Sequence, residues 1–282
     1  MVAGVLGGSA LVLAGGDGAN RLAWLALGVV TCALAAIGWL DDRKSLPVHV
    51  RMPLHLLCGA AVAALAQQVL PVGGALMIPW ILWCVFWTVA AINVVNFMDG
   101  IDGMVAVQGL VYGAYLTALL PVSMTGSWFG LVLASACAAF LLVNWAPASI
   151  FMGDVASGPL GLFLVVGGVL ALEGARIWYV YLPLFPLFYD SLATILRRAR
   201  RAERLTDAHR SHLYQRLANG AFGHARVSAG FGMAAALGAA IGLSSSLITP
   251  AVQAVLLVCY VGASMFAWRR LDVWCTTLNA RA

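Results

Sequence analysis

The sequence predicts an all-α, polytopic integral membrane protein, and two observations carry this prediction. Of the 282 residues, 62% are hydrophobic and only 10% are charged, whereas soluble domains carry about 25% charged residues. The apolar residues also form continuous runs of about the 20 residues that a spanning helix needs, and they do not alternate as barrel strands do. A cytosolic enzyme, a disordered chain and a secreted disulfide scaffold are therefore excluded.

About ten stretches are predicted to span the bilayer. The first is short for a span, and no basic segment precedes it as one would in a signal peptide. No linker or repeat divides the chain, so a single transmembrane domain over residues 1–282 is expected. The predicted spans are 2–15, 22–40, 52–70, 75–97, 103–121, 127–146, 156–172, 177–196, 227–246 and 250–268.

Basic residues mark one side of these spans. All of the 16 Lys and Arg except Arg21 and Arg176 fall in one alternate set of loops, and an excess of Lys and Arg is typical of cytoplasmic loops. Both termini and this set of loops are therefore predicted to be cytoplasmic. Most acids gather at the same face, which favours a reaction at the interface. The loops predicted to be cytoplasmic are 41–51, 98–102, 147–155, 197–226 and the tail after 268.

The first acidic cluster is Asp41 and Asp42, at the end of the second predicted span. Two adjacent carboxylates repel each other, so the pair indicates a nearby cation or a carboxylate that acts as a base. The alternative is a pair of solvated charges at a helix end.

The second cluster is the segment 93–103, which reads N-V-V-N-F-M-D-G-I-D-G. Asn93 and Asn96 are one helical turn apart and share a face, and Asp99 and Asp102 are also three apart. Two amides and two carboxylates at the edge of a bilayer are costly unless they bind something. A simple helix-ending turn explains one Asp-Gly pair but explains this whole segment poorly.

The third cluster places Asp154 and Ser157 at the predicted start of a span. An Asp in this position is suited to Mg²⁺, which prefers one or two carboxylates together with substrate phosphates. Ser157 is a candidate for substrate binding, and the alternative is that it serves as an N-cap.

The segment 197–226 contains eight Arg and three His and is predicted to be a cytoplasmic loop. Attraction to anionic headgroups explains its basic start. The stretch with His209, Arg210, His212 and Tyr214 favours instead the binding of a diphosphate, with Tyr214 stacking on a base or lining a sugar pocket. Acids for a hard cation, cations for a diphosphate and apolar spans for a lipid together favour phosphoryl transfer to a membrane lipid.

These motifs resemble the polyprenyl-phosphate N-acetylhexosamine-1-phosphate transferases, often called glycosyltransferase family 4. Residues 93–103 are similar to the family signature N-x-x-N-x-x-D-G-x-D-G, and Asp41-Asp42 and the F-M-G-D turn ending at Asp154 resemble two further family motifs. The resemblance extends over about residues 2–268. It implies a transferase that moves a sugar 1-phosphate from a UDP-sugar to undecaprenyl phosphate, with Mg²⁺, or Mn²⁺ in its place, as the metal.

The resemblance also implies roles for single residues. Asp154 matches the metal-binding acid, and Asp41, Asp42, Asp99 and Asp102 match catalytic acids, among which no single base is assigned. From the resemblance together with the loop and the third cluster described above, the residues expected to bind the substrates are Asn93, Asn96, Arg51, Ser157, His209, Arg210, His212 and Tyr214.

The chain departs from the family pattern in two respects. The last loop usually reads H-L-H-H-R-L, and here Tyr214 and Gln215 replace two of its His. This is closer to the branch that initiates O-antigen from a UDP-N-acetylated hexosamine than to the peptidoglycan branch. Members also have one more N-terminal span, so the family's first helix is expected to be missing.

The expected function is the first membrane step of O-antigen or another cell-envelope polysaccharide, with release of UMP, in the bacterial inner (plasma) membrane. Two alternatives stay open: a phospho-N-acetylmuramoyl-pentapeptide transferase and a non-enzymatic transporter of lipid-linked sugars. Transporters place ionisable groups near the midplane, and only Asp190 lies inside a predicted span in this way. A homodimer is also left open, and no nucleic acid is expected as a partner.

Overall fold

The computed structural model describes residues 18–172, 177–204 and 209–279, and every regular element in these ranges is helical. Seven helices there are long and apolar enough to cross a membrane, which confirms an all-α polytopic membrane protein. The predicted span 2–15 lies outside the described residues. The seven helices are α2 (Gly18–Lys44), α3 (Val48–Val69), α4 (Met77–Met98), α6 (Thr125–Asn144), α7 (Asp154–Ala171), α11 (Gly223–Leu243) and α12 (Pro250–Asn279).

Two predicted spans are shorter than expected. The stretch 103–121 forms α5 (Met104–Leu119), which has only 16 residues. The stretch predicted at 177–196 is divided into α8 (Ile177–Val180), a 3-10 turn η2 (Leu182–Leu184) and α9 (Phe185–Arg200). Pro183 and Pro186 lie at this break, and proline lacks the N–H that a continuous helix needs.

The predicted loop 197–226 is largely helical where it is described. Helix α9 continues to Arg200, and α10 (Leu213–Leu217) is followed by a π-helical turn η3 (Ala218–Phe222) that leads directly into α11. The predicted tail after residue 268 is also helical, because α12 runs on to Asn279. Two further 3-10 turns, η1 (Gly74–Leu76) and η4 (Ser244–Ser246), precede α4 and α12.

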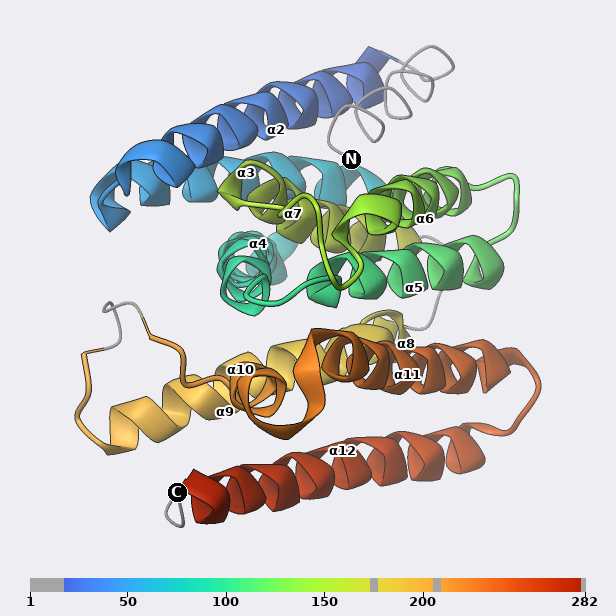
Figure 1. Cartoon of the computed structure of the whole chain (residues 1–282). Helices are drawn as coiled ribbons and strands as arrows, with labels where there is room; N and C mark the ends of the chain where they lie inside the picture. The colour runs from blue at the N-terminus through green and yellow to red at the C-terminus, as the bar shows by residue number, and fades with distance from the viewer. Residues whose placement is uncertain (1–17, 173–176, 205–208, 280–282) are drawn as a thin grey trace.

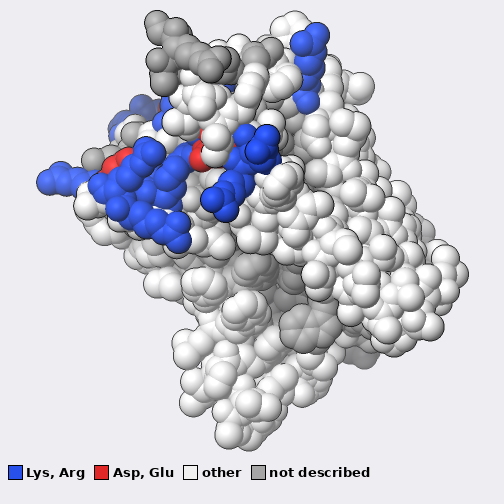
Figure 2. All heavy atoms as spheres, turned by 90° about the horizontal axis from the view of Figure 1, so that it is seen from below, with Lys and Arg blue, Asp and Glu red and all other residues white. Residues whose placement is uncertain are grey.

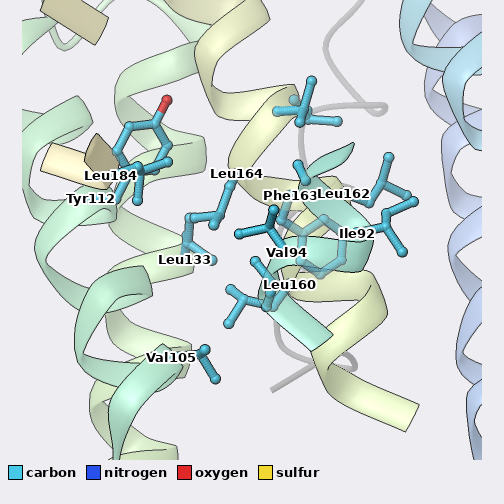
Figure 3. Close-up of a cluster of buried hydrophobic side chains, with 14 of the residues drawn as sticks. Ile92, Val94, Val105, Tyr112, Leu133, Leu160, Leu162, Phe163, Leu164 and Leu184 are labelled. Carbon is cyan, nitrogen blue, oxygen red and sulfur yellow. The ribbon is translucent and has the colours of Figure 1, made fainter. Parts of the chain in front are cut away.

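Helix α7 is the central helix of the fold. Of its most apolar stretch, 89% is buried, compared with 11% for α12, which lies at the edge of the molecule (Figure 1). Figure 3 shows Leu160, Leu162, Phe163 and Leu164 of α7 among side chains from α4, α5 and α6. Helix α7 is therefore fixed in place by packing against several helices. Asp154 is its first residue.

Glycine allows the helices to approach closely at two places. A Cβ on Gly161 of α7 would lie 2.7 Å from the Cα of Ile92 on α4, and one on Gly113 of α5 would lie 2.6 Å from the Gly130 oxygen of α6. Small residues at such contacts let helix backbones pack against each other in membranes, where no hydrophobic force drives helices together.

The charges lie at one end of the helices. Figure 2, which looks onto the α12 side, shows most of the visible Lys and Arg gathered at that end, while the lower part of this view shows no charged side chain. The same end carries the C-termini of α2, α4 and α9 and the N-termini of α7 and α11. The predicted acidic motifs therefore meet at the basic end of the molecule.

Candidate functional site

Three helix ends bring the acidic motifs together. Asp41 and Asp42 lie in the last turn of α2, Asp99 directly follows α4, and Asp154 is the first residue of α7. These four acids come from three segments, each more than 50 residues from the next in the chain. The structure thus unites the three motifs in one site.

Asp42 contacts the start of α7. Its Oδ1 accepts a hydrogen bond of 2.8 Å from the backbone N–H of Asp154, and its Oδ2 accepts one of 3.2 Å from Val155. The first N–H groups of a helix have no partner within the helix, and here a carboxylate from another helix supplies one. Ser157 is thus not the N-cap, since Gly153 occupies that position.

Gly153 makes this contact sterically feasible. Its φ is +63°, in the left-handed region that favours glycine, and a Cβ there would lie 2.7 Å from Oδ2 of Asp42. The Gly-Asp pair in the third motif therefore has a structural cause, namely the sharp entry into α7 beside α2.

Arg51 bridges two of the acids. Its Nη1 donates to Oδ2 of Asp41 and lies 3.4 Å from Oδ2 of Asp154. Asp41 also accepts the backbone N–H of Leu46, and only 8% of its side chain is exposed, against 30% for Asp154. Asp41 is therefore internally neutralised, while Asp154 keeps an accessible face.

The two asparagines of the signature have different partners. Nδ2 of Asn96 donates to Oδ1 of Asp154 and lies 3.3 Å from Oγ of the buried Ser157. Nδ2 of Asn93 donates to the Val89 oxygen at 2.7 Å and lies 3.4 Å from Nδ1 of His55 on α3. Asn96 therefore positions Asp154, whereas Asn93 links α4 to α3.

Asp99 sits half-buried beside the other acids. Burial raises the pKa of Asp99 well above its ordinary value, and the charges of Asp154 and Asp42 raise it further, while a hydrogen bond with the Gly153 backbone acts in the opposite direction. Like charges brought together in this way indicate a place where a cation or a proton is needed.

Asp102 does not join Asp41, Asp42, Asp99 and Asp154, which together are called the acid cluster. Its Oδ2 accepts the N–H of Ala148 at 3.1 Å and lies 3.2 Å from Nδ1 of His224, and its backbone oxygen accepts the Ser228 hydroxyl at 2.7 Å. The next residue, Gly103, has a φ of +75° and donates to the buried Asn144. Asp102 thus connects the turn at 99–103, called the signature turn, to α11 and to the segment after α6.

The candidates in the basic segment are arranged around a buried acid. Asp190 is fully buried and accepts the N–H groups of Leu213 at 3.0 Å and Tyr214 at 3.2 Å, as well as Nε1 of Trp268 at 2.9 Å. The carboxylate therefore fixes the start of α10 against α9 and α12. Burial raises the free-energy cost of this charge, and three N–H donors offset it.

Tyr214 packs behind the signature turn. Its ring is fully buried, and its hydroxyl donates to the Phe97 oxygen at 2.8 Å. A Cβ on Gly100 would meet the Tyr214 hydroxyl and lie 2.8 Å from Nε2 of Gln215. The ring is therefore not accessible for stacking on a base or for lining a sugar pocket, because it is buried against the turn.

The two histidines stack on each other. The ring centroids of His209 and His212 are 5.0 Å apart, and His212 is also 6.2 Å from Phe97. His212 is only 1% exposed, and neither ring nitrogen has a hydrogen-bond partner among the described residues. Burial, together with His209, Arg197 and Arg198, lowers the pKa of His212 to about 3, so its ring is neutral. Arg210 is exposed beside them.

A second group at this end was not predicted from the sequence. Arg197 and Arg216 both pair with Asp272 of α12, and Arg197 also donates to the Ser211 oxygen. These contacts hold α9, α10 and α12 together. Asp190 already stood out in the sequence as an acid inside an apolar span, which is costly, but its partners on α10 and α12 were not predicted.

The donor set fits a hard divalent cation that is completed by a substrate. In the described ranges, no group of three or more His, Cys, Asp or Glu forms a closed metal cage. Mg²⁺ commonly takes one or two carboxylates and receives its other oxygens from phosphates and water. Asp154, with its exposed face and with Asp99 and Asp42 nearby, has that character.

Comparisons with known proteins agree with this geometry. A sequence model of the family described as glycosyl transferase family 4 matches residues 24–172. A phospho-N-acetylmuramoyl-pentapeptide-transferase from Synechococcus sp. (strain JA-3-3Ab) is 34% identical over 193 residues, which cover 62% of this chain and 55% of that protein. A decaprenyl-phosphate N-acetylglucosaminephosphotransferase from Mycobacterium tuberculosis (strain CDC 1551 / Oshkosh) is 30% identical over 234 residues, covering 71% and 58%. The chain thus spans only about half the length of the curated relatives it matches.

Proposed function

The chain belongs to glycosyl transferase family 4, and from that premise we propose that it transfers a sugar 1-phosphate from a UDP-sugar to a polyprenyl phosphate. The observation that carries the proposal is the meeting of Asp42, Asp99 and Asp154 at the basic end of a membrane protein. Both substrates bear phosphates, and the acceptor is anchored in the bilayer. A site with carboxylates for a cation and arginines for phosphate, placed at the interface, suits both.

In the proposed reaction, an oxygen of the lipid phosphate attacks the β-phosphorus of the UDP-sugar. A new P–O bond forms, the bond from that phosphorus to the bridging oxygen breaks, and UMP leaves with the bridging oxygen. The products are UMP and a lipid diphosphate sugar. Atoms and charges balance without any other reactant.

The residues of this chain would bind and orient the substrates. Asp154, held in place by Asn96 and by the cap from Asp42, would hold Mg²⁺ or Mn²⁺, with Asp99 as its neighbour. Such a cation, when bound, neutralises charge on the diphosphate and on the leaving group. Arg51 lies between Asp41 and Asp154 and would contact a phosphate that approaches them. Arg210, which is exposed, and His209, which is half-buried, would contact the diphosphate of the donor.

Two observations point to different donors. The Synechococcus relative, a phospho-N-acetylmuramoyl-pentapeptide-transferase, favours a muramoyl-pentapeptide donor, and the Mycobacterium relative favours an N-acetylglucosamine donor. Tyr214 and Gln215, in place of two histidines, favour a UDP-N-acetylated hexosamine and therefore the second. Undecaprenyl phosphate as acceptor and a role in O-antigen synthesis belong to this proposal. We further propose that the basic end faces the cytoplasm, by the positive-inside rule.

The test supplies membranes containing this chain with undecaprenyl phosphate and a panel of labelled UDP-sugars, including UDP-N-acetylglucosamine and UDP-N-acetylmuramoyl-pentapeptide. Label in the lipid fraction with the first donor alone is the expected result. If no donor labels the lipid while a full-length relative works in parallel, the proposed activity is wrong.

The metal assignment has a separate test. Asp154→Asn should abolish transfer at limiting Mg²⁺ and lower the binding of Mn²⁺, measured by electron paramagnetic resonance. Glu203→Gln is the matched control, since Glu203 pairs with Arg198 away from the acid cluster. Equal Mn²⁺ binding by the two variants would show that Asp154 is not the metal ligand.

A further inference from the structure

A large apolar groove that none of the four clustered acids lines is bordered by Leu213 and Leu217 of α10. It has a volume of about 430 Å³ and is bordered by α9, α10, α11 and α12. Most of its lining is aliphatic or aromatic, and the one charged residue among the lining residues is Arg226, the fourth residue after the π-helical turn. A volume of this size is in the range of ligand-binding pockets.

The groove has the length of one bilayer leaflet. On α11 its lining runs from Arg226 to Leu237, and on α12 from Tyr260 to Leu271. Each stretch covers eleven residue steps, or about 16 Å at 1.5 Å per residue. The hydrocarbon core of a bilayer is about 30 Å thick, so the groove reaches from the basic end to about the midplane.

Arg226 stands where a lipid headgroup would be. It is exposed, and no ion pair in the described part of the chain involves it. Phe222 and Trp274 make a ring contact, with centroids 5.5 Å apart, at the same end of α11 and α12, and tryptophan is enriched at the membrane interface. A free arginine at this level attracts an anionic phosphate.

From these observations we propose that the groove holds one acyl chain of an anionic phospholipid, whose phosphate is bound by Arg226. Hydrocarbon is the surrounding solvent, and an empty apolar groove would lose dispersion contacts on all its walls. A chain confined to one leaflet fits the length of the groove, and the charge of Arg226 selects the headgroup. This lipid is not the acceptor of the proposed reaction, so the inference does not depend on the proposed function.

The bound acyl chain would stabilise the candidate site indirectly, through α10 and Trp268. Leu213 and Leu217 of α10 line the groove, as does Trp268, whose Nε1 donates to Asp190. The same Asp190 fixes the start of α10, and Tyr214 of α10 contacts the Phe97 oxygen. The lipid would therefore stabilise α10 in the position in which it meets the signature turn.

The test compares two pairs of variants. Gly230→Phe fills the groove, because a Cβ on Gly230 would meet no described atom within 4 Å. Gly262→Phe is its control, since Gly262 on α12 has the same free space but does not line the groove. Arg226→Gln removes the charge, and Arg269→Gln on α12 is its control, an exposed arginine outside the lining.

Delipidated full-chain protein is titrated with phosphatidylglycerol, and bound lipid is counted by native mass spectrometry. We expect one tightly bound lipid in the wild type and in both controls, and none in Gly230→Phe. Arg226→Gln should bind about fivefold more weakly, the effect of one basic residue near an anionic headgroup. The thermal midpoint should rise with phosphatidylglycerol only where lipid binds.

Three results would overturn the proposal. Gly230→Phe binding lipid like Gly262→Phe would show that the lipid lies elsewhere. Polyprenyl phosphate displacing phosphatidylglycerol at equal or lower concentration would make the groove an acceptor site. A wild-type dimer that dissociates in Gly230→Phe, with no change in lipid count, would make it an interface between copies of the chain.

Discussion

The carboxylate of Asp42 caps the helix on which Asp154 stands, with hydrogen bonds of 2.8 Å to the N–H of Asp154 and 3.2 Å to that of Val155. Its neighbour Asp41 is turned to Arg51 instead. Adjacent residues of a helix do not face the same way, so the two acids have different partners. The pair therefore combines one residue that anchors α7 with one that neutralises Arg51.

Removing this cap should destabilise the start of α7. We expect Asp42→Ala to cost roughly 0.5–2 kcal/mol, the usual cost of losing a side-chain cap, and to lower transfer activity because Asp154 loses its position. Asn keeps one acceptor oxygen for one of the two N–H groups but turns an NH2 group towards the other, so Asp42→Asn should lose less stability than Asp42→Ala but should not match the wild type. Thermal midpoints of the three proteins test this, and equal losses in both variants would contradict the capping role.

A methyl group on Gly38 should push α2 away from α7. A Cβ at this position would meet the Asp154 carbonyl and lie 2.7 Å from the Val155 nitrogen. We expect Gly38→Ala to cost about 1–3 kcal/mol, as overpacking does. On the same helix, Gly28 has no described atom within 4 Å of such a Cβ, so Gly28→Ala should be neutral or gain up to about 1 kcal/mol. Denaturation of the two variants side by side measures the difference.

Tyr214→Phe should weaken the contact between α10 and the signature turn. The change removes the hydrogen bond from the hydroxyl to the Phe97 oxygen and should cost about 1 kcal/mol. Tyr189→Phe is the control, since no hydrogen bond in the described ranges involves the Tyr189 hydroxyl. Stability and transfer activity should both fall for Tyr214→Phe alone, and unchanged values would show that the contact is dispensable.

Acid should destabilise the protein through His212. Burial and the neighbouring His209, Arg197 and Arg198 lower the pKa of His212 to about 3, whereas the unfolded value is about 6.5. The unfolded state therefore binds the proton first, and the stabilisation is fully present above pH 6.5 and is lost as pH falls from 6.5 towards 3. The thermal midpoint of the wild type should drop more than that of His212→Phe between pH 7.5 and 5. Parallel curves would contradict the buried neutral ring.

Much of the site followed from the sequence because all three acidic motifs stand at helix ends on the basic side. A chain of spanning helices has only two such faces, so charge alone predicted that Asp42, Asp99 and Asp154 would meet. Arg51 was also predicted, although its position between Asp41 and Asp154 required the packing of α3 against α2 and α7.

The contacts of Asp102 and Tyr214 were not predicted from the sequence. One reason is that the chain is not helical at 99–102, where a three-residue spacing would place two side chains on one helix face. Helix α4 ends at Met98, so the three-residue spacing of Asp99 and Asp102 does not put them on one face, and Asp102 turns to His224. Tyr214 was expected to meet a ligand, but α10 buries it against Phe97. No local pattern reveals such contacts, since they depend on how Asp190 joins α9 to α10.

The π-helical turn at Ala218–Phe222 sets the rotational phase of α11. One residue more or less before a helix turns all its side chains by about 100° about the axis. In the phase observed, His224 and Ser228 point at Asp102, while Arg226 and Gly230, two positions further on, line the lipid groove. A single-residue deletion in this turn would therefore disengage both faces at once, although no contact residue had been changed.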